Sequence, residues 1–273
     1  MDMILDFLYG AGVGLALGMT GGGGVLAVPA LMIGLGYTLP QAKPVALIAV
    51  GSAAFIGCLD GLRRGLVRYK AAGVMAVAGT LCAPIGLWLA KNLSITTLMI
   101  IFCTVLLFIS ARMFKQAVSP CKPETRQGSN LLSAKCLVNP STGRFRWTNR
   151  CFASLSSIGG ISGLFSGMLG LGGGFIIVPG VRQFSNLGMH GTVATALAVI
   201  AFISAGTVSV FLITGGVIEP TAWRFIGAAV AGMLIGRTLA PKVSGSLLQI
   251  GFSLLVCAVG VMLLVKTLMP YLR

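Results

Sequence analysis

Charged residues are scarce in this sequence, and acidic residues are the scarcest of all. Only 9% of the 273 residues are charged, five are aspartate or glutamate and one is histidine, whereas 56% are hydrophobic. Because soluble domains carry charge on about a quarter of their residues, this composition excludes a soluble globular protein. It also leaves catalytic triads and paired carboxylates without members, so we do not expect an enzyme.

Closely spaced metal ligands are missing as well. The seven cysteines contain no pair in the CxxC spacing of zinc sites and the chain has one histidine, so we expect neither a metal nor another cofactor. A three-cysteine metal site at Cys121, Cys136 and Cys151 is the alternative, which their wide spacing disfavours. The same three cysteines belong to a stretch that we place below in the cytoplasm, where disulfides are rare. We therefore expect them to stay reduced.

The sequence is instead rich in long apolar runs. Most reach the roughly 20 residues that a helix needs to cross a bilayer, and they lack the ten-residue alternation of membrane barrels. We predict an all-α polytopic membrane protein of about eight transmembrane helices, in two four-helix repeats with glycine-broken first helices. The runs are 5–37, 44–59, 71–90, 92–111, 151–181, 191–218, 225–236 and 243–265.

The two halves of the chain match each other at a shift of 150 residues. The shift superposes Gly22 on Gly172 and Pro29 on Pro179, with further matches along each half. Four crossings per repeat make the repeats parallel, related by an axis along the membrane normal, and this is the arrangement we expect. If the broken first segment re-enters the membrane instead, each repeat has three crossings and the repeats are inverted. The expected divisions are a first transmembrane repeat at 1–115, a cytoplasmic linker at 116–150 and a second transmembrane repeat at 151–273.

Basic residues far outnumber acidic ones and lie mostly in the loops. The net charge of +15 at pH 7 would suggest a nucleic-acid partner in a soluble protein. If the spans alternate, fifteen basic residues fall on one side of the membrane and five on the other. The positive-inside rule then places both termini and the central linker in the cytoplasm. We expect the charges to interact with anionic lipid of the bilayer and not with nucleic acid.

A run of glycines interrupts the first apolar segment of each half. GGGG at 21–24 is followed by Pro29, and GLGGG at 170–174 is followed by Pro179. Each glycine inside a helix costs about 0.8–1.0 kcal/mol relative to alanine, and unpaired backbone is tolerated at membrane depth only where protein or a water-filled cavity supplies partners. Successive N–H groups in such a break form an anion-binding nest, and the helix that resumes adds its positive N-terminal dipole. Close crossing by a neighbouring helix is the alternative function of these glycines.

The polar residues agree with a small anionic substrate. All five acids lie at the ends of apolar runs or in loops, whereas an ion-coupled cation carrier would bury one in the membrane. Hydroxyls near the breaks, including Thr20 and Ser204, would join the backbone donors unless they bond only to their own helix. Arg182 follows the second break and either attracts the anion or snorkels to the interface. The candidate substrate-binding residues are Gly22, Gly23, Gly24, Gly172, Gly173, Gly174, Thr192, Thr195, Ser52 and Arg182.

The doubled glycine–proline motif, the run GTVATALAVI at 191–200 and the small-residue third spans resemble the TauE/SafE family of sulfite exporters. We interpret the small residues of the third spans as helix contacts. The resemblance implies a bacterial permease that moves sulfite, sulfonates or related sulfur-containing anions outward across the cytoplasmic membrane. Where the second half has ATAL at 194–197, the first has PVAL at 44–47 without a hydroxyl, so we expect one site weighted toward the second half. A passive anion channel and a non-transporting interaction subunit are the alternative functions.

Overall fold

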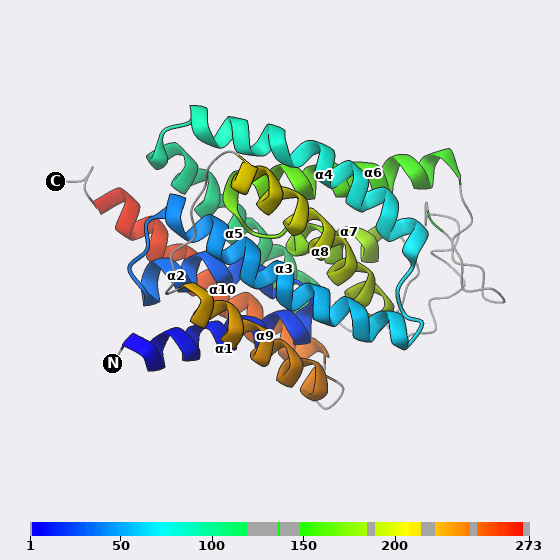
Figure 1. Cartoon of the computed structure of the whole chain (residues 1–273), viewed down its shortest axis with the longest axis horizontal. Coiled ribbons are helices and arrows are strands. Elements are labelled where there is room, and N and C mark those ends of the chain that lie inside the picture. The colour runs from blue at the N-terminus through cyan, green and yellow to red at the C-terminus, as the bar shows by residue number, and fades with distance from the viewer. Residues whose placement is uncertain are drawn as a thin grey trace.

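The computed structural model describes residues 2–118, 136, 148–184, 189–213, 222–240 and 245–269. Every regular element among these residues is a helix (Figure 1), which confirms the predicted all-α class. In chain order the helices are α1 (Asp2–Thr20), η1 (Gly23–Leu26), α2 (Ala27–Gly34), α3 (Leu39–Arg63), α4 (Tyr69–Asn92), α5 (Ile95–Val118), α6 (Asn149–Leu169), α7 (Gly174–Phe184), α8 (Met189–Ile213), α9 (Ala222–Leu239) and α10 (Gly245–Leu268).

Five of the described helices are long and apolar enough to cross a membrane, namely α3, α4, α6 and most of α5 and α8. Large apolar side chains point outward from them. Leu81 and Trp88 on α4, for example, are 71% and 66% exposed. Such side chains suit a lipid environment, because the surrounding hydrocarbon is itself apolar. These are the features of a multi-pass membrane protein, and the fold of the first segment in each half bears on the expected number of eight crossings.

The first segment of each half is a helical hairpin. In the first half, η1 and α2 run back along α1, so that a Cβ on Gly34 would lie 2.5 Å from the ring of Tyr9. In the second half, α7 returns along α6, and a Cβ on Gly180 would lie 3.1 Å from Ile158. The count of one crossing for each broken segment, on which the parallel arrangement depends, is therefore wrong.

Local sequence explains where the hairpins begin and end. The helix that follows the first hairpin, α3, starts at a capping box in which the Thr38 backbone N–H donates to Gln41 Oε1 at 3.1 Å. Pro40 suits this first turn because its missing N–H would have no helical acceptor there. At the tip of the second hairpin, α6 ends at Gly170, whose φ of +78° is the left-handed conformation common at helix C-termini.

The central helices α3 and α8 run antiparallel. A Cβ on Gly51 would lie 2.8 Å from Ser204 Cβ, and a Cβ on Gly61 would lie 3.0 Å from Ala194 Cβ. Residue numbers therefore rise along α3 as they fall along α8. These two helices correspond to each other at the 150-residue shift, and corresponding helices in parallel repeats would run in the same direction. The expected parallel relation is wrong for this pair.

Helices α5 and α10 show the same relation. Ser110 Oγ donates to Ser253 O at 2.8 Å, and a Cβ on Gly260 would lie 3.3 Å from Leu106 Cβ. Residue numbers again rise along one helix as they fall along the other, so α5 and α10 are antiparallel. Both pairs therefore fit inverted halves, which was the alternative arrangement.

Glycines also bring helices of different halves into backbone contact. A Cβ on Gly10 of α1 would lie 2.6 Å from Phe225 O of α9, and one on Gly167 of α6 would lie 3.1 Å from Leu87 N of α4. The third spans α4 and α9 thus serve as close packing surfaces, which supports the interpretation of most of their small residues as helix contacts, whereas a Cβ on Gly73 or Gly227 would meet nothing within 4 Å. The contacting glycines are Gly10, Gly14 and Gly18 on α1 and Gly159, Gly163 and Gly167 on α6.

The hairpins determine on which face of the molecule each half of the chain begins and on which face it ends. Because α2 returns the chain before α3, α4 and α5 traverse the molecule, the start of α1 and the end of α5 lie on opposite faces. In Figure 1 the start of α1 and the end of α10 lie on the left, whereas α6 begins on the right. The expectation that both termini share a side with the linker is wrong for the described residues. Positions 119–135 and 137–147 of the linker lie outside them.

Cys136 and Cys151 are joined by a disulfide, with their Cα atoms 5.0 Å apart. The Cys136 backbone N–H donates to Phe184 O at 3.0 Å. The bridge therefore fastens one point of the linker to the start of α6 and to the end of α7. The expectation that these two cysteines stay reduced is wrong, and Cys121 lies outside the described residues.

Candidate functional site

The two glycine breaks meet inside the molecule. A Cβ on Gly24 would lie 3.2 Å from Leu171 O, and one on Gly174 would lie 2.7 Å from Gly21 O. All residues at these positions are buried. We call the contact the glycine junction. It is formed by residues 21–24 and 170–174 and contains all six glycines predicted to bind substrate.

Helices α3 and α8 enclose the junction. A Cβ on Gly24 would lie 2.8 Å from Val50 of α3, and one on Gly174 would touch Ile200 of α8. Gly172 lies against both helices, since a Cβ there would lie 2.9 Å from Val50 and 3.3 Å from Ile200. The antiparallel pair thus positions the two breaks against each other.

The second break leaves several backbone donors unused. Gly170, Gly172 and Gly173 have φ angles of +78°, +66° and +74°, which glycine adopts at no steric cost. Among the described residues, no acceptor bonds to the N–H groups of 171–174. These groups lie at the N-terminal end of α7, where the helix dipole is positive. Buried donors without a partner are costly, so the arrangement suits a ligand that accepts hydrogen bonds.

Two serines add buried hydroxyls near the junction. Ser204 and Ser166 are 1% and 0% exposed, and neither Oγ has a hydrogen-bond partner among the described residues. Ser204 lies beside the second break, because a Cβ on Gly172 would lie 3.6 Å from its Oγ. Ser162 has another role, since its Oγ donates to Gly173 O at 3.0 Å and so holds the bend in place.

The first break satisfies more of its own donors. The Gly22 N–H donates to Thr20 Oγ1 at 3.2 Å, and the Gly21 N–H donates to Leu17 O at 2.8 Å. Thr20 Oγ1 in turn donates to a carbonyl of its own helix at 2.7 Å. The difference between the breaks favours the second one as the place where a ligand binds.

A small cavity of about 20 Å³ adjoins the junction. Thr20 and Gly22 of the first hairpin line it together with Phe175 and Arg182 of α7. Arg182 is exposed in the last turn of α7, so the cavity lies between the junction and a cation that solvent reaches. Its volume is enough for about one water molecule.

The three other predicted hydroxyls make contacts of their own. Thr195 Oγ1 donates to a carbonyl of its own helix at 2.7 Å and accepts from the Arg68 N–H at 3.2 Å. Ser52 Oγ donates to Ala49 O at 3.1 Å. Thr192 is fully buried in the first turn of α8 and has a polar partner. The hydrogen bonds of Ser52 and Thr195 seen among the described residues do not involve the glycine junction.

The structure contains an ion pair between α3 and α9 that the sequence did not predict. Arg237 donates to Asp60, which also accepts from Arg64 at 3.0 Å. The side chains of Arg237 and Asp60 are 16% and 34% exposed. The two residues belong to different halves, and only the three-dimensional arrangement brings them together.

Comparison with known proteins identifies the family. The family model described as Sulfite exporter TauE/SafE matches residues 6–263. The chain belongs to this family. The resemblance drawn from the glycine motifs is thereby confirmed, and this TauE/SafE protein is a membrane transporter.

Relatives of the TauE/SafE protein occur in Xylella fastidiosa. Proteins named "Probable membrane transporter protein" from strain 9a5c and from strain Temecula1 / ATCC 700964 are each 26% identical to it over 264 residues. The alignments cover 95% of this chain and 94% of each relative. No solved structure matches the chain.

Proposed function

We propose that this TauE/SafE transporter exports a small sulfur-containing anion, such as sulfite or an organosulfonate, across the inner membrane. The observation that carries the proposal is the group of buried donors at the second break. The N–H groups of 171–174 and Ser204 Oγ have no acceptor among the described residues. An anion with several oxygen atoms would accept from these groups, and hydrogen bonds to a charged acceptor are the stronger kind. Membership of a sulfite exporter family supports sulfur oxyanions as the substrate class.

Transport in this proposal alternates between two arrangements of the hairpins. The cavity beside the junction, at about 20 Å³, holds about one water molecule and is too small for sulfite. The structure therefore corresponds to a closed form of the site. Separation of the hairpins toward one face and then the other would give the anion access from each side in turn.

The hairpins imply inverted repeats with three crossings and one re-entrant hairpin each. Counted by the order of the crossings along the chain, fifteen basic residues are expected on one face and five on the other. The face with fifteen is the face of the linker, and both termini are expected on the opposite face. The positive-inside rule places the face of the linker in the cytoplasm and both termini outside. Arg182 then faces the cytoplasm, from which export starts. The five expected on the outer face from their order in the sequence are Lys43, Lys91, Arg224, Lys266 and Arg273.

Sulfite flux from proteoliposomes made with purified protein tests the site. Ser204→Ala removes a donor without breaking a hydrogen bond, so the variant should fold. We expect its flux to fall by about tenfold or more, because a hydrogen bond to a charged group contributes about 1.5–3 kcal/mol. Ser209→Ala is the matched control, since Ser209 is exposed on the same helix and donates only to Ala205 O.

The same assay distinguishes the functions. A carrier gives flux that saturates with sulfite concentration, whereas a channel gives flux that does not, and an interaction subunit gives none. Equal flux from the wild type and Ser204→Ala would refute the site at the second break.

A further inference from the structure

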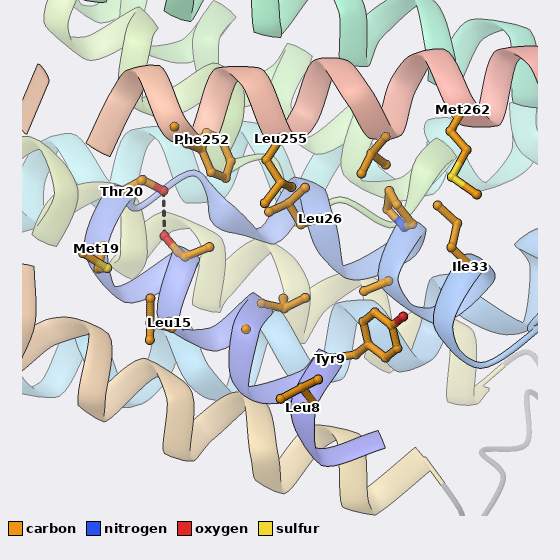
Figure 2. A pocket seen from close by; sticks show the side chains of 17 residues that line it. Leu8, Tyr9, Leu15, Met19, Thr20, Leu26, Ile33, Phe252, Leu255 and Met262 are labelled. Carbon is orange, nitrogen blue, oxygen red and sulfur yellow. Dashed lines mark hydrogen bonds between the residues drawn. The ribbon is translucent and has the colours of Figure 1, made fainter. Parts of the chain in front are cut away.

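A much larger cavity lies between the first hairpin and α10. Its volume is about 610 Å³, and residues of α1, η1 and α2 line it together with residues of α10. Figure 2 shows it extending from Thr20 and Phe252 at one end to Ile33 and Met262 at the other. The volume falls within the roughly 300–1,000 Å³ of small-molecule binding sites.

The lining of this cavity is almost entirely apolar and therefore suits an alkyl chain. Tyr9 and Thr20 are the only polar side chains among the described residues that line it, and none of the lining residues is charged. Thr20 Oγ1 is already engaged, because it donates to Ala16 O at 2.7 Å (the dashed line in Figure 2). A polar ligand would lose its hydration here without compensation, whereas each buried methylene group gains free energy.

One residue links this cavity to the candidate anion site. Thr20 lines both the large apolar cavity and the small cavity that contains Gly22 and Arg182. A linear molecule whose tail lies beside Phe252 therefore has its other end close to the glycine junction.

We propose that the large cavity holds the linear alkyl tail of an amphipathic sulfonate whose headgroup binds at the glycine junction. The inference rests on the proposed function for the headgroup and adds the substrate class. It makes alkylsulfonates better ligands than inorganic sulfite, because the apolar wall contributes binding free energy only to a molecule with a tail.

Two glycines offer a direct test of the cavity. Gly12 on α1 and Gly251 on α10 both line it, and a Cβ at either position would meet nothing within 4 Å. Gly12→Phe and Gly251→Phe are therefore expected to fill part of the cavity from different helices, since their Cβ atoms displace no neighbour. Gly73 on α4 is equally open but does not line the cavity, so Gly73→Phe is the matched control.

The measurement is inhibition of sulfite flux by a series of linear sulfonates from methanesulfonate to hexanesulfonate. In the wild type we expect the inhibitory concentration to fall by about fourfold for each added methylene, from about 0.8 kcal/mol per buried group. Gly73→Phe should keep this slope, whereas Gly12→Phe and Gly251→Phe should flatten it. Partitioning into the bilayer also rises with chain length, so the result is the difference in slope between variants.

Each possible result of this measurement either supports or overturns tail binding in the large cavity. Equal slopes in all four proteins would overturn it, because chain length would then report bilayer partitioning alone. A flat series in the wild type would also overturn it, as expected if a membrane lipid fills the cavity. If the wild type carries no sulfite, the proposed function fails. Tail binding is then tested by a separate measurement, which is the retention of radiolabelled hexanesulfonate by wild type and Gly12→Phe in nanodiscs.

Discussion

Gly172 has two roles at the residue scale, because its backbone conformation and its lack of a side chain both matter. Its φ is +66°, and a Cβ would lie 2.9 Å from Val50 Cγ1 and 3.6 Å from Ser204 Oγ. A methyl group there would strain the backbone and also lie close to Val50 and to the Ser204 hydroxyl. The backbone conformation of Gly172 and the shape of the candidate site therefore both depend on this residue being glycine.

Comparing Gly172→Ala with Gly65→Ala separates these effects. Gly65 also has a φ of +66°, but nothing lies within 4 Å of a Cβ at that position. We expect both variants to lose about 1–2 kcal/mol of stability from the left-handed conformation, and Gly172→Ala to lose more because its Cβ would lie 2.9 Å from Val50 Cγ1, as measured by thermal unfolding in detergent. Sulfite flux should collapse only in Gly172→Ala. Equal flux in the two variants would show that the second break has no part in binding.

The sequence indicated the glycines of the candidate site and named Ser204 among several hydroxyls near the breaks, but it did not distinguish Ser204 from Thr195. Thr195 and Ser204 lie on the same apolar helix, and which of them faces the glycines depends on how α8 packs against α3. In the structure Ser204 lies opposite Gly51 and beside Gly172, whereas Thr195 bonds to the loop before α4. No local pattern distinguishes two hydroxyls on a helix that is apolar all round.

At the scale of elements, the packing of α1 against α9 depends on which face of α1 a glycine occupies. Gly14 lies against the backbone of Ala229, whereas Gly12 on the same helix faces open space. We expect Gly14→Ala to lower the melting temperature because a methyl group would overlap α9. Gly12→Ala should keep or raise it, since alanine favours a helix by about 0.8–1.0 kcal/mol. A similar shift in both variants would contradict the close contact of these helices.

The ion pair between α3 and α9 gives a second prediction at this scale. Asp60→Asn should destabilise the protein by about 1–3 kcal/mol, because the partly buried Arg237 loses its charged partner. The exchange of both residues, Asp60→Arg with Arg237→Asp, should restore part of the loss. Arg64→Gln should cost less than about 1 kcal/mol, since that side chain is 63% exposed. Thermal unfolding of the three variants and the wild type measures these differences, and no recovery in the exchanged pair would count against a direct interaction.

The hairpins mark the limit of what the sequence predicts about the elements. Apolar runs and glycine breaks fix where helices begin and end, but they do not say in which direction a helix resumes. The reversal is visible only in tertiary contacts, such as Gly34 against the ring of Tyr9. The reversal that the prediction missed in each half changes the arrangement from parallel to inverted. It also moves both termini to the face opposite the linker.

At the scale of the whole molecule, the inverted arrangement predicts the side of each chain end. Alkaline phosphatase, which is active only outside the cytoplasm, should be active when fused after Arg273 and inactive when inserted in the linker after position 130. Activity at both positions, or at neither, would contradict the hairpins. Activity only in the linker would keep the inverted arrangement but reverse its orientation, and would place the Cys136–Cys151 disulfide in an oxidising compartment.

The crossed packing of the halves also has a consequence for biosynthesis. Each hairpin rests on a helix of the other half, α1 on α9 and α6 on α4. The first hairpin emerges from the ribosome about 200 residues before its partner, which at about 5–20 residues per second is a wait on the order of ten to forty seconds. The second hairpin finds α4 already made. Newly made first halves are thus the vulnerable intermediate, whose exposed glycine face must be shielded by lipid or by the insertion machinery until α9 arrives.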